Sequence, residues 1–506
     1  MSESQVGWRT LALEAVVAIA TIAIFLALAL SVRINPLLRL GQVSGLASLQ
    51  LRFALIAIPT ILAVIALRRS RHFELAVRLA CAVLAGLASA FVAGGVIVAL
   101  RHTDYCLNAH NGDTGLLALW ANGFSAHDPT RYPPAFYPPA FPHILGWYKD
   151  LSGQPALYAL KDVQIVLTAL VGPATYLAWR RLLRPMWALA IGVVATLVLV
   201  EPYKPYEGLV LVILVPVLIQ LAQALRTAED RTIQQLAKAG LGYGLVLGAL
   251  FLLYSGWFKW SAPGFIVAAL WLIPWRDRRW RAPAILAGVT IVVFVAMVWG
   301  YLGDIHSYGK ATGTGALPGL GGGKPMIQDD YIYFDVLVDP TYFALWKGDL
   351  PGPTTIWPPV GELGGIGVYT LILFAGFGTA IALCRGRTPV IALAAILVGA
   401  WLMRFWYAHH VYDTHLVQLY PRTSIELAYG FVLMVGFAVY YAAERVVRER
   451  PVAYTIGALA AFAFVFGTAG SAIADRYMPS NESYGLGLLA WQAHDATKQA
   501  IPPDPP

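Results

Sequence analysis

The chain has 506 residues, of which 58% are hydrophobic and only 13% are charged. Its mean hydropathy is +0.63, and its formal net charge at pH 7 is +8. This composition excludes a soluble globular protein and predicts an all-α polytopic protein embedded in a lipid bilayer.

Apolar segments long enough to cross about 30 Å of hydrocarbon recur along the whole chain. Each should be a helix, because the bilayer interior offers the backbone no hydrogen-bond partner. The first segment is too long for a signal peptide and lacks a small-residue cleavage pattern, so we expect it to remain as a span. The spans define a transmembrane module over residues 1–470, followed by a short tail, 471–506. About thirteen spans are predicted, at residues 10–32, 49–67, 75–100, 156–178, 185–200, 207–225, 239–254, 262–275, 283–302, 364–384, 388–406, 424–442 and 451–470.

Basic residues alternate with the predicted spans and indicate their orientation. If the N-terminus is cytoplasmic, every predicted inner loop carries a basic cluster, whereas the outer loops and the tail carry few clustered bases. Topology therefore explains the positive net charge, and we expect no nucleic-acid partner. The inner clusters are "RRSR" (68–71), "RRLLR" (180–184), "RTAEDR" (226–231), "RDRRWR" (276–281), "RGR" (385–387) and "ERVVRER" (444–450).

The predicted orientation can be tested by labelling whole cells with a membrane-impermeant thiol reagent. A cysteine replacing Asn122, in the first long outer loop, should react with this reagent. A cysteine replacing Arg278, in an inner basic cluster, should react only after the cells are opened. The reverse pattern of labelling would contradict the predicted orientation.

Polar and aromatic residues gather on the predicted outer side. Nine of the ten histidines, all except His72, fall in predicted outer segments. Two of these segments are long loops, 101–155 and 303–363, and a third polar cluster lies at 407–423. Solvated loops without a function are the alternative, but these loops are rich in Trp, Tyr, His and Pro. We therefore expect one functional face, on the extracytoplasmic side of a multi-pass plasma-membrane protein.

The stretch "HTDYCLNAHNGD", residues 102–113, directly follows a predicted span and carries two carboxylates. Asp104 would lie at the membrane surface, where a carboxylate can act as a general base on a hydroxyl while the donor is borne by a lipid. His102 is near enough to tune it, and a solvated charge at a helix end is the alternative. Asp113 precedes the helical pattern "TGLLALWANG", 114–123, and is expected to cap that helix. A capping carboxylate can still face a substrate, so both acids are catalytic candidates.

The same loop contains the exact repeat "YPPAFYPPAF". Proline fixes its own backbone and restricts the residue before it, so the repeat predicts a stiff loop. Rigid aromatic surfaces suit sugar rings and prenyl chains, and a loop packed on the membrane interface is an equal alternative. The aromatic side chains of the repeat are Tyr132, Phe136, Tyr137 and Phe141.

A leaving phosphate needs cations, and four basic residues lie beside aromatic residues at predicted outer helix ends. Arg422 also begins a helix, whose positive dipole end would add to its effect on an anion. The alternative for each cation is snorkelling to the membrane interface. The four candidates are Lys204, Lys259, Arg404 and Arg422. In the second long loop, Asp329 and Asp330 are the next candidates for a base.

We expect neither a disulfide framework nor a metal site. Only Cys106 of the three cysteines falls in a predicted outer segment. His409, His410 and His415 could donate to a phosphate or form part of a metal site. Their spacing does not place them on one helix face, so no metal site is predicted there. A divalent metal is compatible with the predicted chemistry but is not required.

Six stretches of the chain have an unusual sequence: "YPPAFYPPAF" (132–141), "LYSGWFKWSAPG" (253–264), "YFDVLVDPTYFALWKGDLPG" (333–352), "WPPVGELGG" (357–365), "LYPRT" (419–423) and "DRYMP" (475–479). Together they resemble the galactan 5-O-arabinofuranosyltransferase family, integral-membrane GT-C-type glycosyltransferases of actinobacterial cell-wall assembly. The resemblance covers about residues 10–495. It implies a GT-C-like fold, a decaprenylphosphoryl arabinofuranose donor, a cell-wall galactan acceptor, as in arabinogalactan biosynthesis, and inversion at the arabinose C1.

The general GT-C plan places an acidic base in an early outer loop. This plan carries over to Asp104 or Asp113 and does not choose between them. Family members typically carry a substantial soluble domain after the last span, whereas 36 residues, 471–506, follow the last predicted span here. The identity of the acceptor glycan therefore stays open.

The sequence thus predicts a membrane glycosyltransferase. In the predicted reaction, a glycan hydroxyl attacks C1 of a prenyl-phosphate-linked pentose, Asp104 removes the proton, and cations stabilise the departing phosphate. No nucleotide or flavin cofactor is expected. The alternatives are a transporter or flippase of polyprenyl-linked sugars, and a non-catalytic scaffold of cell-wall assembly. Transporters place charges at the bilayer midplane of two related halves, whereas central charges here are few, chiefly Glu14 and the neighbours Lys161 and Asp162.

Overall fold

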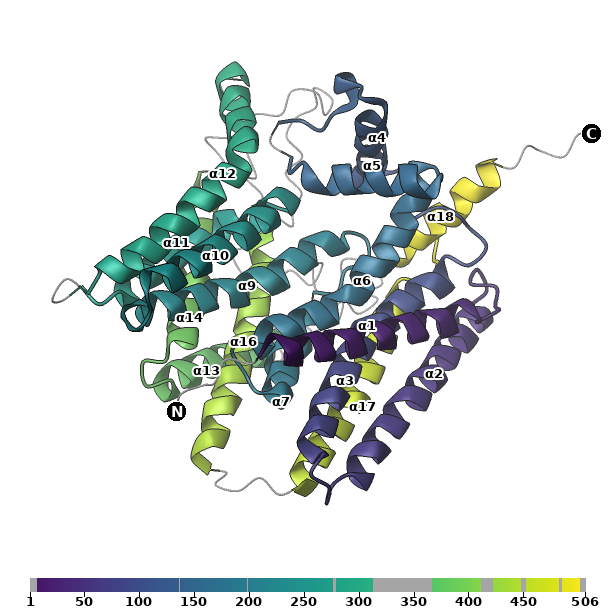
Figure 1. Cartoon of the computed structure of the whole chain (residues 1–506). Helices are drawn as coiled ribbons and strands as arrows, with labels where there is room; N and C mark the ends of the chain where they lie inside the picture. Colours follow the sequence, from purple (N-terminus) through teal and green to yellow (C-terminus); the bar gives the residue numbers. More distant parts are fainter. Residues whose placement is uncertain are drawn as a thin grey trace, which may run out of the picture.

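The computed structural model describes residues 7–135, 137–197, 199–275, 279–312, 366–410, 422–446, 452–481 and 485–500. Within these ranges the chain folds into helices and contains no strand (Figure 1). The all-helical fold class is therefore confirmed for the described part of the chain.

The helices follow one another with short connections. Two short 3-10 segments, η1 and η3, and one π segment, η2, accompany the α-helices. In chain order they are α1 (Trp8–Leu30), α2 (Arg39–Ala66), α3 (Phe73–Ala99), α4 (Gly112–Ala126), η1 (Pro129–Arg131), α5 (Ala140–Ser152), α6 (Ala156–Arg180), α7 (Pro185–Trp187), η2 (Ala188–Val193), α8 (Val194–Thr196), α9 (Pro205–Arg226), η3 (Ala228–Asp230), α10 (Ile233–Leu253), α11 (Gly256–Leu272), α12 (Arg281–Thr312), α13 (Ile366–Leu383), α14 (Thr388–His409), α16 (Arg422–Val446), α17 (Val452–Arg476) and α18 (Gly487–Ala500).

Ten of the described helices are long and apolar enough to cross a membrane. All thirteen predicted spans overlap a helix, but three of them fall short of this length or apolar character. The predicted span 185–200 is the short apolar run Pro185–Thr196, which contains the π segment, and α11 has only 17 residues. The described apolar part of α13 is Ile372–Leu383. The structure thus supports a polytopic membrane protein with ten clear spans among the described helices.

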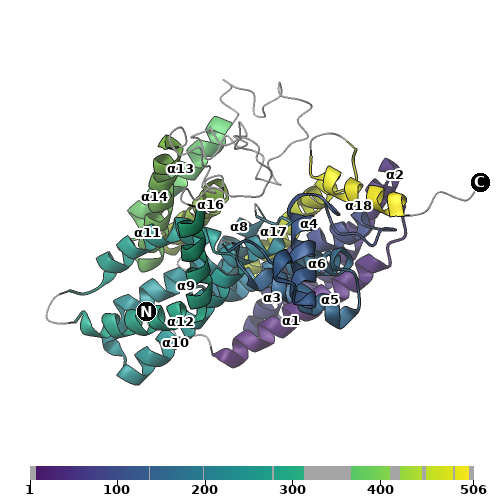
Figure 2. The ribbon, with the colours of Figure 1, turned by 90° about the horizontal axis from the view of Figure 1, so that it is seen from above.

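The long helices form two groups that lie side by side. Seen from above, α9 to α14 and α16 occupy one side, and α1, α2, α3, α6 and α17 occupy the other (Figure 2). Helix α3 is the centre of the second group, and nearly its whole apolar stretch is buried.

Small residues let α6 approach α3 closely. Gly172 packs against the Ala85 carbonyl, so a larger side chain at this position would clash with the backbone of α3. Ser89 of α3 reinforces the contact by donating to the Ala169 carbonyl oxygen at 2.6 Å and accepting from the Gly172 amide at 3.0 Å.

A buried ion pair ties α1 to α3 and α6. The carboxylate of Glu14 is fully buried and accepts from Arg78 at 2.9 Å and from Arg180 at 2.9 Å. Glu14, a charge inside a predicted span, thus joins three helices through its two arginine partners. A buried carboxylate is tolerated where cations and hydrogen bonds compensate its charge, as they do here.

Polar contacts join helix ends that the sequence places on the same side of the membrane. On the predicted inner side, Arg226 donates to the Gly386 carbonyl at 2.9 Å, and Arg387 pairs with Glu444 at 2.7 Å. On the predicted outer side, the Arg101 guanidinium donates to the Leu30 carbonyl at 2.7 Å. These contacts agree with the predicted alternation of loops, whereas the absolute orientation stays a prediction.

Candidate active site in the first long loop

The first long loop begins with a tight turn that prepares the start of α4. Asn108 has a φ of +71° and Gly112 a φ of +53°, the left-handed region that Asn and Gly tolerate best. The Asn108 side-chain amide donates to the Asn111 carbonyl at 2.9 Å and to the Tyr203 hydroxyl at 3.0 Å. The turn is thereby tied to the short connection that precedes α9.

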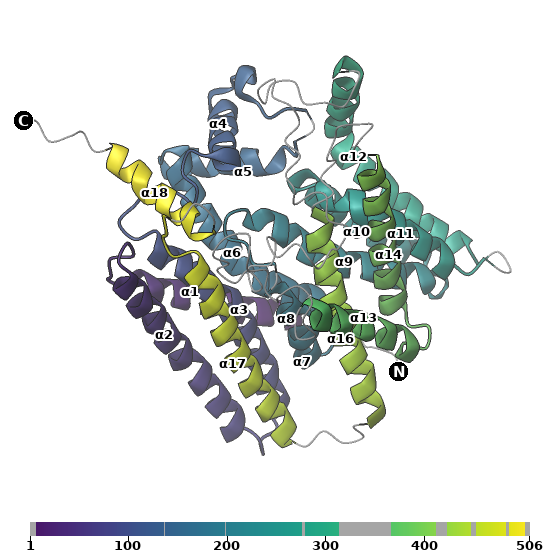
Figure 3. The ribbon, with the colours of Figure 1, turned by 180° about the vertical axis from the view of Figure 1, so that it is seen from behind.

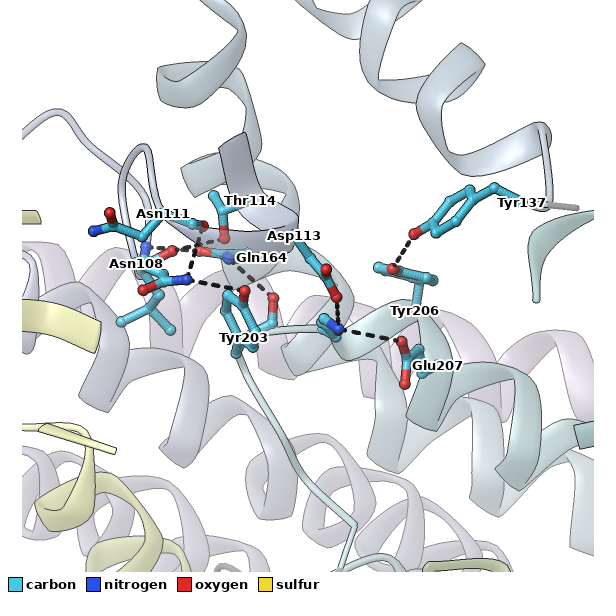
Figure 4. Close-up of polar contacts among 11 residues, drawn as sticks. Asn108, Asn111, Asp113, Thr114, Tyr137, Gln164, Tyr203, Tyr206 and Glu207 are labelled. Atoms are coloured by element: carbon cyan, nitrogen blue, oxygen red, sulfur yellow. Dashed lines mark hydrogen bonds and ion pairs between the residues drawn. The ribbon is translucent and has the colours of Figure 1, made fainter. Parts of the chain in front are cut away.

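Gln164 joins the same two connections. Its side chain is buried in α6, accepts from the Leu107 amide at 3.0 Å and donates to the Tyr203 carbonyl at 3.0 Å (Figure 4). One buried amide therefore holds the loop after α3 and the connection before α9 in a fixed relation. Gln164 is not predicted as a site residue from the sequence, because a lone polar residue within an apolar helix carries no motif.

This framework brings an acidic side chain, Asp113, and a basic one, Lys204, together. The Asp113 carboxylate forms an ion pair with Lys204, and the Lys204 ammonium also lies 3.9 Å from the Glu207 carboxylate (Figure 4). The Lys204 side chain is only 11% exposed, whereas that of Asp113 is 46% exposed. The Lys204 cation is thus nearly buried, and the Asp113 carboxylate beside it still reaches solvent. This arrangement is expected of a general base, here Asp113, next to a site for an anion.

The predicted capping role of Asp113 is wrong. The N-cap of α4 is Asn111, without a capping side-chain hydrogen bond, and Asp113 lies in the first helical turn. The helix starts two residues earlier than the pattern 114–123 predicted, at Gly112, whose φ of +53° lies in the left-handed region that glycine tolerates. In the first turn, the carboxylate has a favourable interaction with the helix dipole and remains available to Lys204.

Aromatic side chains line one flank of this acid–base pair. The Tyr137 hydroxyl lies 2.8 Å from the buried Tyr206 hydroxyl, and the Tyr137 ring packs on Trp120 at 4.4 Å. Phe141 stacks on Tyr206 at 4.0 Å. Tyr137 and Phe141 of the "YPPAFYPPAF" repeat therefore contact Tyr206, two residues after Lys204. Trp120, Phe141 and Tyr206 are buried, so among these rings only the half-buried Tyr137 can contact a bound ligand.

Asp104 lies apart from this cluster. It is exposed in the turn after α3, and it makes no salt bridge with any of the residues the structure describes. The nearby Lys161 ammonium donates instead to the backbone carbonyls of Leu100 and Thr103. His102, with a φ of +69°, is exposed beside it. The two acids of the stretch thus have different surroundings: Asp113 forms an ion pair with the nearly buried Lys204, whereas Asp104 interacts with Lys161 at longer range, without an ion-pair contact.

The other predicted site residues are distributed over several elements. Tyr132 packs on Phe124 at 4.5 Å, at the C-terminal end of α4, whereas Asp113 lies in its first turn. Lys259 of α11 lies over the Trp260 ring, at 5.4 Å, and the His410 ring nitrogen lies 2.8 Å from the Trp406 carbonyl. Arg404 is buried and donates to Thr423 at 3.1 Å, and His409 is exposed at the end of α14. Phe136, Asp329, Asp330 and the side chain of Arg422 lie outside the described part of the structure.

The last helix supports the loop from behind. Helix α18 runs from the end of α17 toward the first long loop (Figure 3). The Leu489 carbonyl accepts from the Asn108 amide at 2.8 Å, and the Ala493 carbonyl accepts from the Thr103 hydroxyl at 2.9 Å. The segment predicted as a plain outer tail therefore forms part of the framework of the site.

Protonation of His494 should weaken this support. His494 is buried in α18, its Nε2 lies 2.8 Å from the Ala99 carbonyl, and His102, Lys161 and Lys498 are the charged groups around it. Burial is the main cause that lowers the pKa of His494 below its usual 6.5, and the neighbouring cations add to it. The undocked helix then binds a proton more readily than the docked one. The docking of α18 on the first long loop should therefore be fully stable above pH 6.5. As the pH falls below 6.5, the free energy of docking should weaken, by up to about 1.4 kcal/mol for each unit by which the docked state lowers the pKa of His494.

Hydrogen exchange of the α18 amides, corrected for the intrinsic effect of pH, measures this loss of docking. The variant His494→Gln keeps a donor for the Ala99 carbonyl but does not titrate, so it is the matched control. Equal pH dependence in the wild type and in this variant would contradict the role of His494.

No protein-family model and no curated protein matches this chain. Among the described residues, no group of three or more His, Cys, Asp or Glu side chains is placed to hold a metal ion. The geometry of the first long loop is therefore the basis on which a function is proposed.

Proposed function

We propose that the protein is a membrane glycosyltransferase that takes a sugar from a polyprenyl-phosphate donor. The single observation that carries the proposal is the pair of Asp113 and Lys204. An exposed carboxylate lies directly on a nearly buried ammonium, beside aromatic rings and at the end of membrane-spanning helices. A lipid-linked sugar phosphate presents its reactive carbon and its phosphate at that depth, because its tail stays in the bilayer.

In the proposed reaction, Asp113 accepts the proton of an acceptor hydroxyl as the hydroxyl oxygen bonds to C1 of the sugar. The bond between C1 and the phosphate oxygen breaks on the opposite face, so the configuration at C1 inverts. Lys204 donates to an oxygen of the departing prenyl phosphate and offsets its charge. Glu207, 3.9 Å from the Lys204 ammonium, holds it in place when Asp113 turns to the acceptor.

The resemblance of the sequence motifs makes the proposal more specific. We propose decaprenylphosphoryl arabinofuranose as the donor and a hydroxyl of cell-wall galactan as the acceptor, with the reaction on the extracytoplasmic face of the plasma membrane. Buried Arg404 and half-buried Lys259 are further cations for the donor phosphate. His102, His409, His410 and Tyr132 belong to the outer surface over which a glycan would pass.

The test is a transfer assay with the full-length protein in nanodiscs. Radiolabelled decaprenylphosphoryl arabinose and an oligogalactan are the substrates, and we expect label in the oligogalactan. The same protein in liposomes is assayed for movement of the donor between leaflets. Movement of the donor without transfer would favour a flippase, and neither transfer nor movement would favour a scaffold, so either result contradicts the proposed enzyme.

A further inference from the structure

A groove runs between α2 and α17, two membrane spans whose apolar stretches are mostly not buried. Helix α2 lies at the edge of the molecule in two opposite views (Figures 1 and 3). Val43, in the wall of the groove, is 50% exposed, so the groove opens onto the membrane-facing surface. Its volume is about 410 Å³, and it is lined by Arg39, Val43, Leu46, Ala47 and Gln50 of α2 and by Thr468, Ser471, Ala472 and Asp475 of α17.

One end of the groove, which we call its mouth, lies at the level of the lipid headgroups. The mouth is formed by Arg39, the first residue of α2, and Asp475, the next to last residue of α17. Counted from the other end of α2, at Ala66, Gln50 lies about 24 Å and Arg39 about 40 Å along the helix. A bilayer has about 30 Å of hydrocarbon and a total thickness of about 40–45 Å. Gln50 therefore lies among the acyl chains of the leaflet whose headgroups surround the mouth, the outer leaflet in the predicted orientation.

Small side chains create the hollow between the two helices. On α2 the lining residues recur every three or four positions, so they form one face of the helix. Ala47 on this face, with Ser471 and Ala472 on the facing side of α17, leaves space that larger side chains would fill. The Gln50 amide donates to the Ser471 hydroxyl at 2.9 Å across the groove. The lining residues beyond the mouth are uncharged, so this part of the groove suits an acyl chain.

The mouth presents a cation and an anion side by side. The Arg39 guanidinium pairs with the Asp475 carboxylate at 2.7 Å, and the two side chains are 65% and 37% exposed. The side-chain oxygen of Gln42 accepts from the guanidinium at 3.1 Å. Gln42 is itself buried, and its amide donates to the carbonyls of Pro36 and Pro479 at 2.8 and 2.9 Å. A buried side chain thus fixes the position of the cation at the mouth.

These two charges match those of a zwitterionic phospholipid headgroup. A guanidinium binds phosphate oxygens through paired N–H donors, and a carboxylate accepts hydrogen bonds from a primary ammonium. An exposed ion pair contributes little to stability, so Arg39 and Asp475 can exchange each other for a headgroup at small cost. We propose that the groove binds a phospholipid of the phosphatidylethanolamine class, with its phosphate on Arg39, its ammonium on Asp475 and one acyl chain along the groove.

The carboxylate at the mouth makes the site selective among phospholipids. The ammonium of phosphatidylcholine carries methyl groups in place of hydrogens and cannot donate to Asp475. Phosphatidylglycerol has no cation in its headgroup, so its phosphate would lie near the carboxylate as a like charge. A protein partner fits less well, because each side of a standard protein–protein interface takes about 20–30 residues, and nine residues line the groove. The lipid site does not depend on the proposed enzyme, since none of its residues belongs to the cluster around Lys204.

Native mass spectrometry of the full-length protein tests the lipid site. The protein in detergent is titrated with phosphatidylethanolamine, phosphatidylcholine and phosphatidylglycerol that carry the same acyl chains, and the fraction of protein with one bound lipid is measured. Asp475→Asn removes the anion at the mouth, Arg39→Gln removes the cation, and Ala472→Phe fills the groove. Glu444→Gln is the matched control, because the pair of Glu444 and Arg387 has the same length of 2.7 Å, is also partly exposed and lies outside the groove.

We expect the wild type to bind phosphatidylethanolamine severalfold more tightly than phosphatidylcholine. Asp475→Asn should remove this preference, whereas Glu444→Gln should keep it. Arg39→Gln and Ala472→Phe should weaken the binding of all three lipids severalfold. Gel filtration confirms that each variant is folded, and the preference is a ratio measured within one sample, so it does not depend on the yield of folded protein.

Three results would overturn the lipid site. One is equal binding of phosphatidylethanolamine and phosphatidylcholine by the wild type. Another is a preference that survives in Asp475→Asn or is lost equally in Glu444→Gln. The third is a protein dimer that shows no lipid preference and is lost in Ala472→Phe, because a second copy of the chain would then cover the groove.

Discussion

The variant Asp113→Asn should lose sugar transfer almost completely, with turnover lowered by about 10²–10⁴-fold. An amide has the shape of the carboxylate but cannot accept the proton of the acceptor hydroxyl. The side-chain oxygen can still accept from Lys204, and Glu207 remains 3.9 Å from the ammonium, so the framework should persist. Donor binding should therefore change little while turnover collapses. The measurement is the transfer assay at matched protein amounts, together with the affinity for the donor.

The control for this experiment is Asp104→Asn. From the sequence alone, Asp104 is the favoured base because it lies nearest the end of a predicted span. In the structure, Asp104 is exposed and has no salt bridge among the described residues, so its replacement should leave most of the activity. If Asp104→Asn is inactive and Asp113→Asn is active, the sequence interpretation was right and the structural one is wrong. If both variants are active, the base lies elsewhere, and Asp329 and Asp330 become the candidates.

Of the variants proposed here, Glu14→Ala should lower the free energy of unfolding most. Removing this carboxylate leaves the guanidinium of Arg180, which is 4% exposed, without its anion. Breaking a buried pair from one side costs about 3–5 kcal/mol, because the remaining charge stays buried and uncompensated. We expect a strongly lowered unfolding temperature, measured as the fraction of protein that remains monodisperse in detergent after heating.

Arg78→Ala is the graded control for Glu14→Ala. The Arg78 side chain is 28% exposed, and its removal leaves the pair of Glu14 and Arg180 intact. Its effect on the unfolding temperature should therefore be clearly smaller. Equal losses in the two variants would show that the buried carboxylate is not what holds α1 against α6.

The span pattern was predictable because each span is a local property of the chain. An apolar run of sufficient length must form a helix in lipid, whatever its neighbours are. All thirteen predicted spans accordingly overlap a helix. Ten of the described helices have the length and hydropathy needed to cross a membrane. The short segment Pro185–Thr196 differs because it contains a π segment, which no hydropathy pattern reveals.

The candidate site was predictable in its residue types but not in its pairing. Asp113 and Lys204 were both identified from the sequence, in different roles and 91 positions apart. Their contact depends on the fold of the loop, on the positive φ of Gly112 and on the two hydrogen bonds of Gln164. Hydrophobic periodicity contains none of this information. The same is true of the contact between Asn108 and Leu489, which joins segments far apart in the chain.

That last contact sets an order of events during biosynthesis. The hydrogen bond from Asn108 to Leu489 spans 381 positions, since 489 minus 108 is 381. At about 5–20 residues per second, a ribosome needs roughly 20–75 s to make the intervening chain. Throughout that interval the first long loop is already synthesised but lacks its last supporting helix. The loop therefore matures only after α18 has been synthesised, and a nascent chain stalled before α18 should carry both residues of the acid–base pair in an unsupported form.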